Sequence, residues 1–288
     1  MLLTYLLLAL SVAALWLGGD ERTPAWRRQA WLFVLLGAGL AGLGSGSVRP
    51  VGFFAMIAFL ALAWACNRPQ FSGRVRSALA VALLFFAGAL MLHAVPGFVN
   101  PKVIAGVRFT PDALPFSLYL NFDKTLVGLA IVGWGLPRLA RASDFRAMLR
   151  VALPVVVLLA VVLMGLSLAA GYVRWAPKFP PESWLWLGVN LGFVCLAEEA
   201  LFRGFIQREL QLALGRYRHG PMVALAVAAL LFGLAHAAGG ATYVALATVA
   251  GLGYGWVYQR TGRIEAAVLV HWMVNTVHFL GFTYPALA

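Results

Sequence analysis

The chain has 288 residues, of which 62% are hydrophobic and 11% are charged, and its mean hydropathy is +0.86. Soluble domains contain roughly 45–50% apolar and about 25% charged residues, so this composition excludes a soluble globular protein and indicates a single polytopic membrane domain. The formal net charge of +12 does not indicate nucleic-acid binding, because the basic residues are spread over short loops between apolar runs.

The chain contains about ten apolar runs that are long enough, or nearly so, to span ~30 Å of hydrocarbon. They cover approximately residues 2–18, 29–46, 51–66, 77–98, 116–136, 150–172, 184–206, 221–238, 241–259 and 264–283. We therefore predict an all-α fold, a polytopic transmembrane helix bundle with about 8–10 spanning helices. The first run has no basic start and no convincing small-residue cleavage site, so we interpret it as a retained spanning helix.

Basic residues are concentrated on one side of these runs. The odd-numbered loops contain 15 Lys and Arg residues and the even-numbered loops contain 5. Because cytoplasmic loops are enriched in basic residues, we expect the odd-numbered loops in the cytoplasm and both termini outside. The Pro-containing segments 99–115 and 174–183 are then expected to be outer loops, with Trp175 and Trp184 at the membrane interface. Asp123 and Lys124, within run five, either form a structural pair or mark a different helix boundary.

The seventh run contains two adjacent carboxylates, Glu198 and Glu199. A charge at membrane depth is costly, so such a pair indicates a functional site. At about 100° per residue, Glu199 and Arg203 lie ~40° apart on a helix, whereas Glu198 points ~100° away from Glu199. We therefore predict that Arg203 neutralises Glu199 and that Glu198 acts as a general base. The alternative is that both glutamates only end a spanning helix at the lipid headgroups.

The eighth run ends close to His236, in the segment FGLAH. Glu198 and His236 are each 19 residues from Tyr217, so two helical arms of a hairpin would place them at similar depth. Phe232 precedes His236 by four residues, on the same helical face, where it would form a wall of the site. The alternative is a structural histidine whose hydrogen bonds are satisfied near a helix end.

The last run contains His271 and Asn275, four residues apart on one helical face, and His278 follows ~20° from His271 on the same stripe. Polar groups on one face of an apolar helix face protein or water rather than lipid. The alternative is interhelical hydrogen bonding, which needs only one of the three side chains. In a straight helix His271 need not lie at the depth of Glu198.

The segments EEALFR, FGLAH and HWMVN, in this order, resemble the motifs EExxxR, FxxxH and HxxxN of the CAAX protease and bacteriocin-processing (CPBP, or Abi) family of intramembrane glutamic endopeptidases. The stretch GLGYGWVYQRTGR is also similar to the family's approach to the last motif, although Arg263 stands where a small residue is usual. The resemblance covers roughly residues 184–283. Each motif is weak alone, and all three in order are specific.

The resemblance implies a hydrolase, a peptidase that cleaves a membrane-associated protein or peptide near the membrane surface. Glu198 and His236 would activate the attacking water, and His271 with Asn275 would bind the oxyanion. The supporting residues would be Glu199, Arg203 and Phe232. These residue types suit the chemistry, because peptide hydrolysis needs a base for water and donors for the developing oxyanion. No cofactor is then required.

Other functions are also compatible with these residues. Glu198, His236 and His271 could ligate zinc, with water in the fourth position, as in a zinc-dependent CAAX-type metalloprotease. The lack of an HExxH motif and the presence of the Asn275 amide favour the metal-free mechanism. A non-catalytic immunity protein and a transporter are further alternatives; inverted repeats would favour the transporter, and we find none in the sequence.

The division of the chain follows from where the motifs lie. We predict N-terminal transmembrane helices of unassigned role over residues 1–175 and a CPBP-like catalytic core over residues 176–288. The expected partners are a membrane-associated peptide or protein substrate and the lipid bilayer, and no nucleic acid. The Arg-rich, Ala/Leu/Gly-rich composition indicates a bacterial protein, so we expect a multi-pass protein of the inner membrane.

Overall fold

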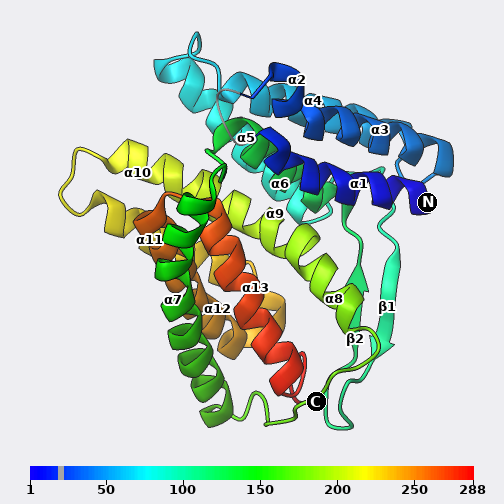
Figure 1. Cartoon of the computed structure of the whole chain (residues 1–288), viewed down its shortest axis with the longest axis vertical. Helices are drawn as coiled ribbons and strands as arrows, with labels where there is room; N and C mark the ends of the chain where they lie inside the picture. The colour runs from blue at the N-terminus through cyan, green and yellow to red at the C-terminus, as the bar shows by residue number, and fades with distance from the viewer. Residues whose placement is uncertain (19–22) are drawn as a thin grey trace. The chain divides into compact units, whose positions relative to one another are not determined.

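The computed structural model describes residues 1–18 and 23–288, and helices make up most of them (Figure 1). Arg22, one of the basic residues counted for the first loop, lies outside the described residues. The helices are α1 (Leu2–Ala14), α2 (Ala25–Arg28), α3 (Ala30–Ser45), α4 (Pro50–Cys66), α5 (Gly73–Met91), α6 (Phe122–Gly135), α7 (Ala142–Ala169), α8 (Ser183–Val189), α9 (Leu196–Glu199), α10 (Arg208–Leu214), α11 (Gly220–Leu234), α12 (Gly240–Thr261) and α13 (Ile264–Gly281).

Among the described residues, four helices are long and apolar enough to cross a membrane: Gly73–Met91, Ala142–Ala169, Ser183–Leu214 and Ile264–Gly281. A fifth span arises if the pair Gly220–Leu234 and Ala237–Thr261, bent by 55°, crosses as one. Three further apolar helices are shorter, Leu2–Gly18, Ala30–Ser45 and Pro50–Cys66. The predicted polytopic helical bundle is confirmed as the fold class, with fewer full-length spans than the apolar runs suggested.

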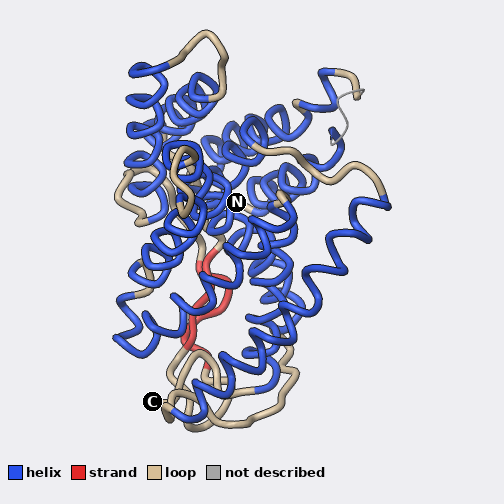
Figure 2. Tube along the Cα trace, turned by 90° about the vertical axis from the view of Figure 1, so that its left-hand side faces the viewer, coloured by secondary structure: helices blue, strands red, loops and turns tan. Residues whose placement is uncertain are grey.

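A two-stranded antiparallel sheet interrupts the helices, and the sequence analysis did not predict it. Strand β1 (Lys102–Val107) pairs with β2 (Phe116–Tyr119), and Figure 2 shows the pair in red. The register places Ile104 opposite Leu118. The expected span over 116–136 therefore begins as a strand, and its helix starts only at Phe122. The physical reason is local: β1 contains the β-branched residues Val103, Ile104 and Val107, and β2 follows Pro115 and contains the aromatic residues Phe116 and Tyr119, which favour an extended chain over a helix.

The described residues form two compact units. Unit 1 comprises Met1–Pro101, Leu120–Ala140 and Gly192–Gly204. Unit 2 comprises Lys102–Tyr119, Arg141–Leu191 and Phe205–Ala288. The long helix Ser183–Leu214 contributes residues to both, so each unit contains part of the motif-bearing region.

In unit 1, helix α6 packs closely against α9, the segment that ends in the two glutamates. A Cβ atom at Gly128 would lie 3.0 Å from the Cα of Ala197, so the two backbones meet at a position where any larger residue would push them apart. Small residues allow such close helix contacts in membrane proteins. The glutamate segment is therefore held by backbone packing.

Asp123 marks the start of α6 and is paired with the preceding loop. It is 1% exposed, and its carboxylate lies 2.6 Å from His93 Nδ1 and accepts from Asn100 Nδ2 at 3.0 Å. The backbone N–H of Lys124 also donates to it, at 2.9 Å. A carboxylate in the first helical turn is stabilised by the helix dipole. The question left open by the sequence is thus answered: Asp123 marks a helix boundary, and its side-chain partners are His93 and Asn100.

We expect Asp123→Ala to lower the free energy of unfolding by about 2–3 kcal/mol, because the half-buried Asn100 amide and the first helical turn lose their charged acceptor. Denaturant unfolding in detergent micelles would measure the change. Asp112→Ala is the matched control, since the Asp112 carboxylate is 39% exposed and its change should be small. Equal unfolding midpoints for the two variants would contradict the importance of this cluster.

In unit 2, helices α7, α12 and α13 lie side by side, and α11 packs against α12 (Figure 1). A Cβ at Gly251 would lie 3.1 Å from the Cα of Ala229, and one at Gly255 would lie 2.7 Å from Gln207 Oε1. Gln207 is fully buried, and its Nε2 donates to the carbonyl oxygen of Gly255 at 3.0 Å. Two glycines four residues apart thus allow α12 to approach both neighbours closely.

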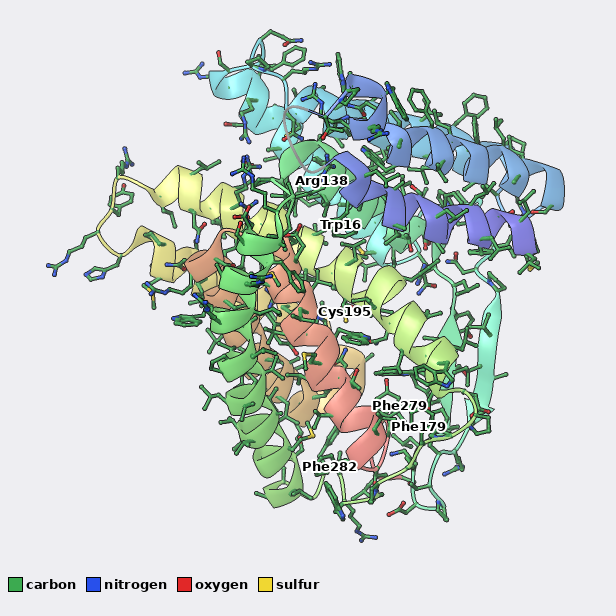
Figure 3. The ribbon with its side chains drawn as sticks, in the orientation of Figure 1. Trp16, Arg138, Phe179, Cys195, Phe279 and Phe282 are labelled. Atoms are coloured by element: carbon green, nitrogen blue, oxygen red, sulfur yellow. The ribbon has the colours of Figure 1, made fainter. Side chains whose placement is uncertain are left out.

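The C-terminal end of α13 is hydrogen-bonded to the segment that precedes α8 and packs against α8. Figure 3 shows Phe279 and Phe282 at this end and Phe179 in the neighbouring loop. The backbone N–H of Lys178 donates to the carbonyl of Leu280 at 2.8 Å. The ring of Trp186, which is fully buried, stacks on Phe279 with centroids 4.2 Å apart. These contacts fix the register of α8 against α13.

Candidate active site

The two glutamates occupy the end of the short helix α9, which lies between two π-helical segments, Asn190–Cys195 and Ala200–Gln207. π-helical turns are rare and are frequent at functional sites. They hold more residues per turn than an α-helix, so the rotation assumed for a straight α-helix does not apply along the whole run. Side chains farther from α9, such as that of Asn190, therefore face directions that a straight α-helix would not predict.

Glu199 and Arg203 form the ion pair that the sequence predicts. Arg203 Nη1 donates to Glu199 Oε1 at 3.1 Å, and both side chains are fully buried. Glu198 is half-buried. A fully buried charge needs a partner to offset its loss of hydration, and Arg203 supplies one for Glu199. The two adjacent carboxylates therefore have different surroundings.

His236 lies in the break between α11 and α12, just after Leu234 ends α11. Its Nδ1 is 2.7 Å from the carbonyl oxygen of Phe232. A carbonyl oxygen can only accept, so Nδ1 must carry the proton, and in the neutral ring Nε2 is the basic nitrogen with the lone pair. The main chain thus selects the tautomer in which Nε2 can accept a proton.

Phe232 contacts both histidines of the predicted site. Its ring, 2% exposed, has its centroid 4.7 Å from that of His236 and 5.7 Å from that of His271. Tyr254 stacks on His271 with centroids 4.6 Å apart and ring planes 17° apart. His271 itself is 4% exposed. Two aromatic rings, one edge-on and one stacked, therefore restrict the orientation of the His271 imidazole.

Asn275 Nδ2 donates to Asn190 Oδ1 at 3.3 Å, across the contact between α13 and the start of the first π-helical segment. One turn earlier, Trp272 Nε1 donates to the carbonyl oxygen of Leu187 at 3.0 Å. His278 differs, because its Nε2 lies 3.3 Å from the carbonyl oxygen of Thr283 in the C-terminal segment. His278 is thus bonded to the main chain.

The structure brings Phe232, His236 and His271 together in unit 2, with Asn275 on the same helix as His271. Glu198 belongs to unit 1, with the Glu199–Arg203 pair. Sequence reasoning missed Asn190 and Tyr254. Asn190 is a polar residue inside an apolar run, so the cost of burying a polar group could have identified it. Tyr254 had no such signal, because tyrosines are common in packed cores.

Residues 180–277 match the family model described as Type II CAAX prenyl endopeptidase Rce1-like. The match spans the segment that contains all three motifs. No curated protein and no solved structure matches the chain. The resemblance to the CAAX protease and bacteriocin-processing family that the three motifs indicated is thus confirmed over residues 180–277, which are similar to the Rce1-like model.

Proposed function

We propose that this protein is an intramembrane endopeptidase that hydrolyses a peptide bond of a membrane-associated protein or peptide near the membrane surface. The matched family supports peptide hydrolysis as the reaction. The observation that carries the proposal is the tautomer of His236, because a hydrogen bond to the Phe232 carbonyl makes Nε2 a proton acceptor. Hydrolysis without a side-chain nucleophile needs such an acceptor to activate water.

In the proposed reaction, Glu198 and His236 Nε2 bind the attacking water and take one of its protons. The water oxygen bonds to the scissile carbonyl carbon, and the carbonyl oxygen becomes an oxyanion. Asn275 and His271 donate hydrogen bonds to that oxyanion. The proton then passes to the leaving amine as the C–N bond breaks, which returns Glu198 and His236 to their starting state.

The rings of Phe232 and Tyr254 support the role of His271 as an oxyanion donor. Preorganised donors stabilise a transition state best because they need not reorient as charge develops. Phe232 and Tyr254 hold the His271 ring from two directions, so little reorganisation remains. Glu199 and Arg203 have a different proposed role: their buried pair keeps the helix that carries Glu198 electrically balanced.

We expect His236→Asn to lower kcat by about 10²- to 10⁴-fold, the range for loss of a general base. The asparagine amide can still donate to the Phe232 carbonyl, but it has no group at the position of Nε2. His219→Asn is the matched control, since His219 is exposed in the turn before α11. Cleavage of a transmembrane peptide, followed by mass spectrometry, gives the rates. Similar rates for the two variants would contradict the proposed base.

The substrate and the metal requirement need a direct assay. The match to a prenyl endopeptidase model makes lipid-tail peptides one substrate class to test, and transmembrane peptides are the other. Glutamate and histidine side chains also suit zinc, since Nε2 of His236 offers the lone pair that a ligand needs. A strong chelator, followed by zinc, would separate the proposed metal-free mechanism from the zinc-dependent alternative.

A further inference from the structure

The side chain of Asn190 contacts a residue of the proposed oxyanion site, although no motif includes Asn190. Its Oδ1 accepts from Asn275 Nδ2 at 3.3 Å. Asn190 is 6% exposed and lies where α8 passes into the first π-helical segment. Both asparagines belong to unit 2. A buried amide pair between two helices orients both amides, because each amide needs hydrogen-bond partners away from water.

The orientation of the Asn275 amide matters for the proposed chemistry. An asparagine amide has a donor end, Nδ2, and an acceptor end, Oδ1, and a half-turn about the last side-chain bond exchanges them. Only the Nδ2 end stabilises an oxyanion, whereas Oδ1 would repel it. The amide must therefore be held in one of two orientations that fill the same space.

We propose that Asn190 is a positioning residue for hydrolysis: its Oδ1 accepts a hydrogen bond from Asn275 Nδ2 and so keeps the donor end of that amide at the oxyanion site. The inference rests on the proposed role of Asn275. Asn190 does not touch the substrate. While Oδ1 of Asn190 faces Asn275, a flipped Asn275 amide would place two acceptor oxygens against each other, so this orientation of Asn190 disfavours the flip.

The helices that carry the two asparagines have a fixed register, which makes positioning through this bond effective. Trp272 Nε1 donates to the Leu187 carbonyl at 3.0 Å, and Trp186 stacks on Phe279 at 4.2 Å. These contacts lie on either side of the amide pair along α13. The long helix Ser183–Leu214, which contains Asn190, also contains Glu198, eight residues further along the chain.

The test compares three variants in the full-length protein with a transmembrane peptide that the wild type cleaves. Asn190→Leu removes the acceptor and keeps the branching of the side chain, and it should lower kcat about 10- to 100-fold with KM changed less than about threefold. Asn190→Asp keeps an acceptor oxygen and should recover most of the lost kcat. Asp123→Ala, the destabilising substitution described above, is no part of the proposed site, and it should lower the melting temperature with less than about a threefold change in kcat.

A double-variant comparison separates positioning from a general loss of structure. In an Asn275→Ala background, Asn190→Leu should cause no further loss of kcat, because Asn190 acts through the Asn275 amide. If the double variant loses kcat by the product of the two single-variant factors, the proposal is overturned. Asn190→Ala replaces Asn190→Leu in the same comparison if the leucine variant does not fold.

The outcomes also distinguish this inference from the proposed function. If Asn275→Ala cleaves at the wild-type rate, the oxyanion role of Asn275 is wrong, and the positioning role is wrong with it. If Asn275→Ala is impaired and Asn190→Leu cleaves normally, only the positioning role is wrong. If Asn190→Asp is as slow as Asn190→Leu while it remains folded, the acceptor role of Asn190 is overturned.

Discussion

Glu198→Gln is expected to lower peptide hydrolysis by about 10²- to 10⁴-fold while the protein remains folded. The glutamine amide has nearly the shape of the carboxylate but cannot accept the proton of the attacking water. Glu198 is half-buried, and the buried ion pair next to it uses Glu199, so the substitution leaves that pair in place. Single-turnover cleavage with purified protein would measure the loss.

The matched control for this result is Glu209→Gln. Glu209 lies on the same long helix, in α10, and its Oε1 lies 4.0 Å from Arg208 Nη1. Its substitution should leave hydrolysis near the wild-type rate. A Glu198→Gln protein that cleaves as fast as the Glu209→Gln protein would remove the basis for a glutamate-dependent reaction.

Arg203→Met is expected to lower the free energy of unfolding by about 3–5 kcal/mol, or to prevent accumulation of the protein. Arg203 and Glu199 are both fully buried, and removal of the guanidinium leaves a charged carboxylate without its Arg203 partner in an apolar helix. This is the largest stability effect that we expect from a single substitution in this chain. Unfolding in detergent micelles, or abundance in membranes, would measure it.

The double variant Glu199→Leu with Arg203→Met tests the cause of that loss. Replacing a buried pair by apolar side chains of similar volume is often neutral or stabilising, so the double variant should recover most of the lost stability. If it is as unstable as Arg203→Met alone, the damage comes from packing around Arg203. If Arg203→Met is as stable as the wild type, the ion pair has no structural importance.

The Glu199–Arg203 pair could be predicted because it depends on local geometry alone. The two residues are four apart, and the contact forms directly between them at 3.1 Å. The membrane-protein class was similarly accessible, because it follows from composition. The contact between Phe232 and His236 also follows from a separation of four residues, and their ring centroids are 4.7 Å apart.

Features that depend on tertiary contacts could not be predicted from the sequence. The stacking of Tyr254 on His271 and the bond between Asn190 and Asn275 join residues of different helices, and no local pattern specifies either contact. The π-helical segments on either side of α9 were missed for a related reason: packing selects them, and their hydrophobic pattern is that of an ordinary apolar helix.

The antiparallel pair of strands β1 and β2 was missed because hydropathy was given more weight than local β-propensity. The apolar run over 116–136 is long enough for a span, but Pro115 and the aromatic residues after it favour a strand, which ends at Tyr119. The structure starts α6 at Phe122 with Asp123 in its first turn. A carboxylate near the start of a helix is a boundary signal that the sequence did contain.

The central claim, metal-free intramembrane peptide hydrolysis, is tested most directly by incubating the purified protein with a panel of transmembrane and lipid-tail peptides, with and without a strong chelator. Mass spectrometry of the products would identify the bond that is cut. We predict cleavage at an internal peptide bond that is indifferent to the chelator and absent in Glu198→Gln. Cleavage that is lost on chelation and restored by zinc, or that persists in Glu198→Gln, would contradict it.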